Sequence, residues 1–183
     1  MMSFQKILIA SAVMLLANTG SGAPQPARST PTLIQRLDGE GWRIATDDKN
    51  HGREEQWFAA PRSEAKTVAV PSTIQEAFPN YHGLAWYWKF FELPPNPDPQ
   101  GRYLLRFQSV DYKADIWVNG VQVGSHEDAE EPFMLDVTAA VRAGTANLLA
   151  VRVLNPNNTT IDGLTLGQTA RGAKVLPQWP GME

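Results

Sequence analysis

The stretch Ala114-Asp115-Ile116-Trp117-Val118-Asn119-Gly120-Val121-Gln122-Val123 decides the fold of this chain. Two short runs of mainly apolar residues flank the dipeptide Asn119-Gly120. Asparagine and glycine tolerate the positive φ angles that a two-residue hairpin turn requires. The stretch therefore predicts a β-hairpin with strands at 114–118 and 121–123.

Segments on both sides of this hairpin predict further strands. Apolar and polar residues alternate over Tyr103–Gln108, and Leu148–Val153 is a second run compatible with one buried face. Ala85–Leu93 is rich in aromatic residues and stops at the proline-rich run Pro94–Pro99, where prolines remove the donors of a sheet ladder. Helical periodicity is almost absent, so an all-β architecture is expected.

Two short helical turns are expected within this framework. Ser72-Thr73-Ile74-Gln75 has the spacing of a capping box. The stretch Thr138–Gly144 begins with a capping hydroxyl and ends with a terminating glycine.

Composition indicates a soluble globular body and excludes several classes of function. Of the 183 residues, 43% are hydrophobic and 19% charged, which is enough for one folded domain. The formal net charge of -3, without a block rich in lysine or arginine, argues against nucleic acid or an anionic membrane as partner. The absence of cysteine excludes disulfides, thiolate metal ligands and a cysteine nucleophile.

Residues 1–23 are typical of a secretion signal peptide. Lys6 supplies the positive start, Ile7–Ala17 is an apolar run too short to span a bilayer comfortably, and small residues follow up to Ala23. A membrane anchor or a buried helix is the alternative for this run. Export is the expectation, to the periplasm or the medium, with the mature chain starting between Gly20 and Ala27. Residues 24–32 form a proline-containing linker, and residues 33–183 form the folded body.

The order and spacing of these residues resemble the sugar-binding domain of family 2 glycoside hydrolases, the group of β-galactosidases, β-glucuronidases and β-mannosidases. The aromatic strand Trp86-Tyr87-Trp88-Lys89-Phe90-Phe91 begins the similarity. Its further elements are Leu105, Phe107, Val110-Asp111-Tyr112, Ala114, Trp117-Val118-Asn119-Gly120, Val123-Gly124, His126-Glu127, Pro132-Phe133, Asp136-Val137-Thr138, Asn147 and Val151-Arg152-Val153. Asp128 departs from the pattern, because the family usually has glycine after the His-Glu pair.

The resemblance implies a jelly-roll β-sandwich of the galactose-binding type, in agreement with the strands expected above. It also implies a non-catalytic N-terminal domain of an exported hydrolase that acts on O-glycosidic bonds. In that family two glutamates on a downstream (β/α)8 barrel perform the hydrolysis. Such a barrel does not fit in this chain, so the implied partners are carbohydrate and the catalytic barrel of the parent enzyme.

No catalytic residue, metal ligand or cofactor site is assigned from the sequence. The carboxylate pair Asp111 and Asp115 and the acidic run Glu127–Glu131 are the local candidates for acid-base chemistry, but nothing near them is built to separate two pKa values. The run reads better as a solvated loop, with calcium binding as an alternative. Three widely separated histidines (His51, His82 and His126) do not indicate a zinc site, and a Gly-x-Ser-x-Gly elbow is absent.

Aromatic residues and one aspartate are the candidates for sugar contact. Indole rings can stack on a pyranose, and the available tryptophans are Trp57, Trp86, Trp88, Trp117 and Trp179. For those inside strand patterns, packing in the sandwich is the preferred interpretation. In the family, a loop after the Val-Arg-Val strand reaches the active site with an aspartate. The resemblance therefore implies Asp162 as a substrate-binding residue, with a turn-forming Asp162-Gly163 as an equal alternative.

Three functions are compatible with these observations: an accessory domain of an exported glycosidase, a free-standing carbohydrate-binding module, and a structural or adhesive sandwich. After Asn147–Leu154 no second long alternating apolar run follows, so the jelly roll is expected to lack its closing strand and the chain to be a fragment of a longer enzyme. The alternative is a complete domain in which Ala173–Leu176 is a short edge strand.

Overall fold

Strand β9 (Ala146–Asn155) lies at the centre of the larger of the two sheets that form the sandwich. A computed structural model describes residues 8–12 and 33–165 of the chain. The order across the larger sheet is β3 (Lys66–Val70), β2 (Gly39–Thr46), β4 (Gly83–Glu92), β9, β6 (Lys113–Val118) and β7 (Val121–Glu127). All neighbours in it are antiparallel.

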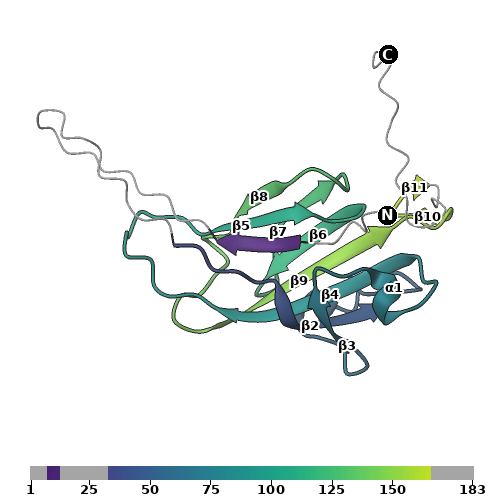
Figure 1. Ribbon diagram of the computed structural model, residues 1–183, viewed down its shortest axis with the longest axis horizontal. Helices are drawn as coiled ribbons and strands as arrows, with labels where there is room; N and C mark the ends of the chain where they lie inside the picture. The colour runs from purple at the N-terminus through teal and green to yellow at the C-terminus, as the bar shows by residue number, and fades with distance from the viewer. Residues whose placement is uncertain (1–7, 13–32, 166–183) are drawn as a thin grey trace, which may run out of the picture.

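A smaller sheet packs over this one as the second layer of a sandwich (Figure 1). It contains β1 (Leu8–Ala12), β5 (Leu104–Ser109) and β8 (Phe133–Asp136), with β5 in the middle. A separate two-stranded ladder joins β10 (Thr160–Ile161) to β11 (Leu164–Thr165).

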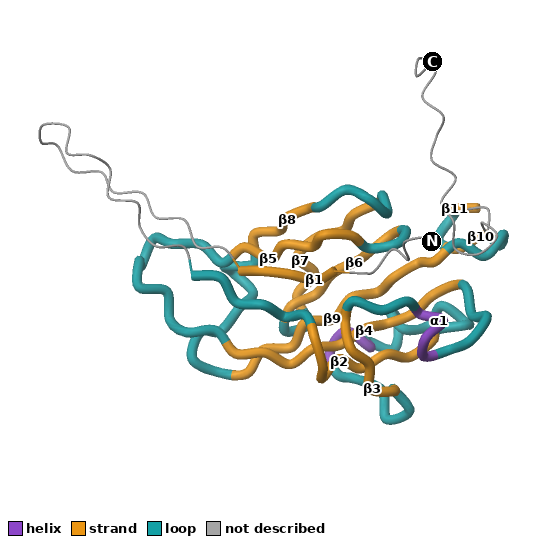
Figure 2. The backbone as a smooth tube through the Cα atoms, in the orientation of Figure 1, coloured by secondary structure: helices purple, strands orange, loops and turns teal. Residues whose placement is uncertain are grey.

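Helix is confined to two short pieces in the described part of the chain, the 3-10 helix η1 (Trp57–Ala59) and helix α1 (Ile74–Ala77) (Figure 2). Neither is long and apolar enough to cross a membrane. The all-β prediction is therefore confirmed, and with it the sandwich architecture.

The main core fills the space between the two layers. The larger sheet contributes inward-facing side chains such as Ile44, Tyr87 and Val151, all at most 1% exposed. The smaller sheet contributes Leu105 and Phe107, which alternate with outward-facing residues along β5. Burial of this alternating apolar set is what holds the two sheets together.

The hairpin predicted at Asn119-Gly120 is present. Asn119 has a φ of 52° and Gly120 a φ of 82°, and Val118 pairs with Val121 across the turn. The expected strands at Ala85–Leu93, Tyr103–Gln108 and Leu148–Val153 correspond to β4, β5 and β9, with ends shifted by one to a few residues.

The two predicted helical turns differ from the structure in position or extent. At the first, the capping box is formed one residue later, by Thr73 and Glu76, and the backbone N–H of Thr73 donates to Glu76 Oε1 at 3.1 Å. Gln75 instead donates to the carbonyl of Tyr81. The second prediction, a helical turn within Thr138–Gly144, is confirmed for one turn at its start, where Val141 N–H donates to Val137 O at 3.0 Å. The turn does not continue to Gly144, and β9 begins at Ala146.

The predicted leader, linker and closing strand fall largely on residues outside the described part. Of residues 1–23 only Leu8–Ala12 is described, as the strand that pairs with β5 in an irregular register. Signal cleavage and export stay predictions, as does the edge strand at Ala173–Leu176.

Candidate functional site

A charged row crosses the outer face of the larger sheet, on the side away from the main core. Arg152 of β9 pairs in register with Trp86 of β4 on one side and with Asp115 of β6 on the other. The side chain of Arg152 is 1% exposed and that of Asp115 is 6% exposed. A buried cation and a buried carboxylate are therefore direct cross-strand neighbours.

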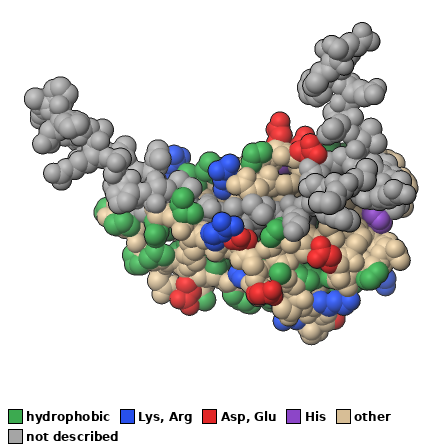
Figure 3. All heavy atoms as spheres, viewed as in Figure 1, with side chains coloured by type: hydrophobic (Ala, Val, Ile, Leu, Met, Phe, Trp, Pro, Cys, Tyr) green, Lys and Arg blue, Asp and Glu red, His purple; other side chains and the backbone are tan. Residues whose placement is uncertain are grey.

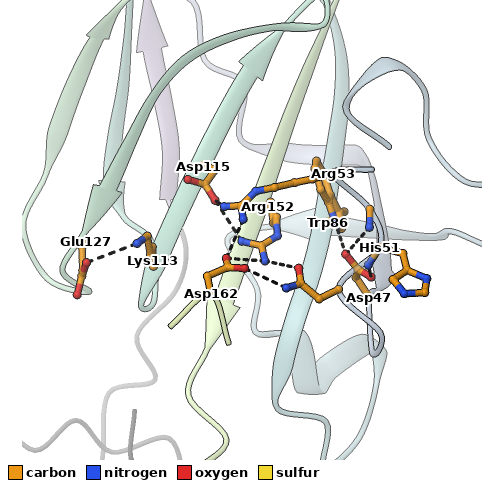
Figure 4. A network of polar contacts seen from close by, with 11 residues as sticks. Asp47, His51, Arg53, Trp86, Lys113, Asp115, Glu127, Arg152 and Asp162 are labelled. Atoms are coloured by element: carbon orange, nitrogen blue, oxygen red, sulfur yellow. Dashed lines mark hydrogen bonds and ion pairs between the residues drawn. The ribbon is translucent and has the colours of Figure 1, made fainter. Parts of the chain in front are cut away.

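Two arginines and two aspartates meet at this row (Figure 4). Arg152 Nη1 lies 3.1 Å from Asp115 Oδ2, and its Nη2 lies 2.8 Å from Asp162 Oδ2. Arg53 bridges the same two carboxylates, contacting Asp115 with Nη2 and donating to Asp162 Oδ2 with Nη1 at 2.9 Å. Asn50 completes the group, because its Oδ1 accepts from Arg152 at 2.6 Å and its Nδ2 donates to Asp162 at 2.9 Å.

The loop that supplies Asn50 and Arg53 is fixed by Asp47. One carboxylate oxygen of Asp47 accepts the backbone N–H of His51 at 2.9 Å. The other accepts both the backbone N–H of Gly52 and the indole N–H of Trp86, each at 3.0 Å. A Cβ on Gly52 would lie 2.3 Å from Trp86 Nε1, so only glycine allows the loop to approach the ring this closely.

Asp162, the residue expected to bind substrate, lies in the turn between β10 and β11. Its φ of 52° and the φ of 79° at Gly163 show that the turn-forming interpretation of this dipeptide is correct. Burial alone would raise the pKa of its carboxyl. The hydrogen bond from Asn50 and the charges of Arg152 and Arg53 outweigh this effect and lower the pKa below the ordinary value. Its contact with sugar stays a prediction.

Four of the five candidate tryptophans are packing residues. Trp86 and Trp88 are fully buried, and Trp57 and Trp117 are nearly so. They form a second core on the outer face of the larger sheet, where the ring centroids of Trp86 and Trp117 are 5.1 Å apart. The segment that contains η1 covers them, and Trp88 donates its indole N–H to the carbonyl of Trp57. Trp179 lies outside the described residues.

The acidic candidates are dispersed or already paired. Asp115 belongs to the arginine network, and the acidic run is mostly exposed, with Glu127 3.8 Å from Lys113. Asp128 has a φ of 154°, a conformation that favours the glycine usual in the family. Residues 8–12 and 33–165 contain no group of three or more histidine, cysteine, aspartate or glutamate residues placed to hold a metal ion. Charged side chains are scattered over the face seen in Figure 3.

Sequence reasoning did not single out Asn50, Arg53 or Arg152 as a group. A signal for Arg152 was present, because an arginine inside the otherwise apolar run Leu148–Leu154 must find a partner if that strand is buried. Asn50 and Arg53 gave no such signal, since they lie about 100 residues away in a polar loop.

Comparison with known proteins gives a consistent result. Residues 73–166 match the model of the glycosyl hydrolases family 2 sugar binding domain. The chain is 35% identical over 153 residues to a β-glucuronidase of Rattus norvegicus and 32% identical over 122 residues to one of Paenibacillus borealis. These alignments cover 76% and 64% of this chain, but only 23% and 20% of the relatives.

Solved structures agree with the sequence relatives. A Ruminococcus gnavus β-glucuronidase in complex with C6-substituted uronic isofagomine superposes with a TM-score of 0.64 at 26% identity, covering 80% of this chain and 24% of that one. An uncultured Clostridium sp. β-glucuronidase gives a TM-score of 0.61 at 32% identity, and the match covers 68% of this chain and 22% of that one. The chain thus spans about a fifth to a quarter of the proteins it matches. The family model, the relatives and the fold agree. The chain therefore belongs to glycoside hydrolase family 2 and corresponds to the sugar-binding domain of that family.

Proposed function

We propose that this chain is the N-terminal accessory domain of an exported family 2 glycoside hydrolase of the β-glucuronidase type, and that it does not turn over substrate by itself. The observation that carries the proposal is the match of residues 73–166 to the sugar-binding domain, together with relatives of which the alignments cover only 20% and 23%. Its partners would be a carbohydrate and the catalytic barrel of the parent enzyme.

The state of the carboxylates supports a non-catalytic role. Glycoside hydrolysis requires two carboxyl groups about 5 to 10 Å apart on either side of the scissile bond. Asp115 is buried and ion-paired with two arginines, so it is not accessible to a sugar. Glu127 is exposed at the end of β7, where its carboxylate lies 3.8 Å from the ammonium group of Lys113.

The state of the tryptophans supports an accessory domain over a free-standing sugar-binding module. A stacking platform needs an exposed indole face. Trp57, Trp86, Trp88 and Trp117 pack against each other instead, under the segment that contains η1. Both carboxylate oxygens of Asp162 are already bonded, one to Asn50 and the other to the two arginines.

Activity of the purified chain tests this proposal. We expect no hydrolysis of nitrophenyl glucuronides, galactosides or mannosides, with a complete family 2 β-glucuronidase as the positive control. Turnover that a single carboxylate substitution abolishes would overturn the proposal. Saturable binding of glucuronic acid by calorimetry, together with cooperative unfolding of the isolated chain, would favour the module instead.

Export is tested separately. N-terminal sequencing of protein secreted by cells that express the full reading frame should give a first residue between Gly20 and Ala27. Recovery of a cytoplasmic product that retains Met1 would contradict it.

A further inference from the structure

The side chains around Asp162 form an arrangement suited to a carboxylate. Asn50 Nδ2, Arg53 Nη1 and Arg152 Nη2 all lie within 2.9 Å of its two oxygens. Two guanidinium groups and an amide are the donors that proteins use to bind carboxylates. We call Asn50, Arg53 and Arg152 the arginine site.

Charge balance at this place depends on Asp162. Arg152 is almost completely buried, and Arg53 is 39% exposed. Asp115 contacts both arginines and can neutralise only one positive charge. Without Asp162 the arginine site would keep one uncompensated positive charge, and a buried excess charge favours the capture of an anion.

Within the described residues, the backbone of the hairpin that bears Asp162 joins no other strand. Its strands have two residues each, and their ladder joins β10 only to β11 within the described chain. A two-stranded hairpin of this length is not stable in isolation. The contacts of Asp162 connect the hairpin to the larger sheet through Arg152. They also connect it to the 47–53 loop through Asn50 and Arg53.

We propose that the arginine site is a carboxylate-binding site that the chain fills with its own Asp162, and that this internal ligand fastens the β10–β11 hairpin to the sandwich. When Asp162 is withdrawn, the site accepts a carboxylate from solution. The inference concerns contacts within the domain and does not depend on the proposed function.

The test uses the full chain carrying Asp162→Gly, because glycine retains the positive φ of the turn while the side chain, with its carboxylate, is removed. Guanidinium resonances of Arg53 and Arg152 are followed by NMR while sodium acetate is added, with sodium chloride at equal ionic strength as the reference. We expect a saturable shift in the variant, at acetate concentrations about tenfold below those that affect the unchanged protein. Glu54→Gln is the matched control, since it removes one exposed negative charge beside Arg53 without touching the site.

A second measurement, amide hydrogen exchange, reports on the stability of the β10–β11 hairpin. Amide exchange of Leu164 and Thr165 should accelerate about tenfold in Asp162→Asn and Asp162→Gly, while the amides of β9 and the Glu54→Gln variant stay unchanged. Equal acetate responses in the unchanged protein and Asp162→Gly would overturn the proposal. So would a folded Asp162→Gly protein that shows no acetate response, or unchanged hairpin exchange in both variants.

Discussion

Two hairpins of this molecule use nearly the same turn and are stabilised in different ways. Asn119-Gly120 and Asp162-Gly163 both place their first residue at a φ of 52°, followed by a glycine at 82° or 79°. The first turn joins β6 and β7, which extend the larger sheet, whereas the second joins two strands of two residues each. A turn sequence thus decides the local backbone, while the stability of a hairpin depends on what its strands and side chains contact.

The first side chain of each turn shows the same contrast. Asn119 donates to Ala140 O and to Asn147 Oδ1, both at 2.8 Å, and accepts the backbone N–H of Leu148 at 3.0 Å. These are neutral hydrogen bonds beside a buried strand. Asp162 makes charged contacts with Arg53 and Arg152 at the partly exposed edge of a polar network.

The largest expected effect comes from removing Arg152, the buried cation that pairs with both Asp115 and Asp162. We expect Arg152→Met to lower the free energy of unfolding by about 3 to 5 kcal/mol, because it leaves Asp115 buried with only the half-exposed Arg53 as partner. Urea denaturation measures this. The double variant Arg152→Met, Asp115→Leu should recover part of the loss, and a cost for the single variant below about 1 kcal/mol would show that the pair is not important for stability.

A second substitution alters the loop side of the network. Gly52→Ala would place a methyl group 2.3 Å from Trp86 Nε1 and 2.7 Å from Asp47 Oδ2, so the loop must shift and lose its hydrogen bonds. We expect a cost of about 2 kcal/mol, together with faster amide exchange in the β10–β11 hairpin that Arg53 contacts. Gly144→Ala provides a steric control, because its Cβ would meet no atom within 4 Å, although its φ of 72° adds a cost in the turn. Unchanged exchange in the hairpin would mean that loop and hairpin are independent.

The same substitution in both turns gives the direct comparison. Asn119→Gly and Asp162→Gly each retain the turn geometry and remove the side-chain contacts. We expect Asn119→Gly to cost about 1 to 2 kcal/mol of global stability, since the Ala140 carbonyl and the Leu148 N–H lose the side chain that they bond to. Asp162→Gly should cost less than about 1 kcal/mol, because the buried Arg152 keeps Asp115 as its partner, Arg53 is partly solvated and the hairpin adds little to the core. The reverse order in urea denaturation would refute this account.

The smallest effect is a dependence on pH that only the second hairpin should show. Since the pKa of the Asp162 carboxyl is lowered in the folded protein, its contribution to stability is fully present above the ordinary carboxyl pKa and is lost as the pH falls through the lowered one. Carbon NMR of the carboxyl should give a midpoint below 3.8, and Arg53→Gln should raise that midpoint. A midpoint at or above 3.8 would contradict the ion pairs around Asp162.

The fold was largely predictable because its signals are local. Asn119-Gly120 specifies a turn through backbone sterics, and the alternation over Tyr103–Gln108 specifies one buried face. The capping box was misplaced by one residue, since Ser72 and Thr73 offer the same hydroxyl and Gln75 and Glu76 a similar acceptor. The helical turn within Thr138–Gly144 is present only as one turn at its start, because a local cap and glycine do not show how far a helical turn continues.

By itself, the sequence determined the all-β class, the positions of β4, β5, β6, β7 and β9 and the hairpin turn at Asn119-Gly120, because these follow from side-chain periodicity and from the φ angles that asparagine and glycine tolerate. For Asp162-Gly163 a turn was one of two open interpretations. Only the tertiary structure decided that Asn50 and Arg53 meet Arg152 and Asp162, and that the tryptophans are buried under the segment with η1. The physical reason is that these contacts join segments far apart in the sequence, separated by 31 residues for Trp57 and Trp88 and by 109 for Arg53 and Asp162. Their distances are set by how strands associate into sheets rather than by any local pattern.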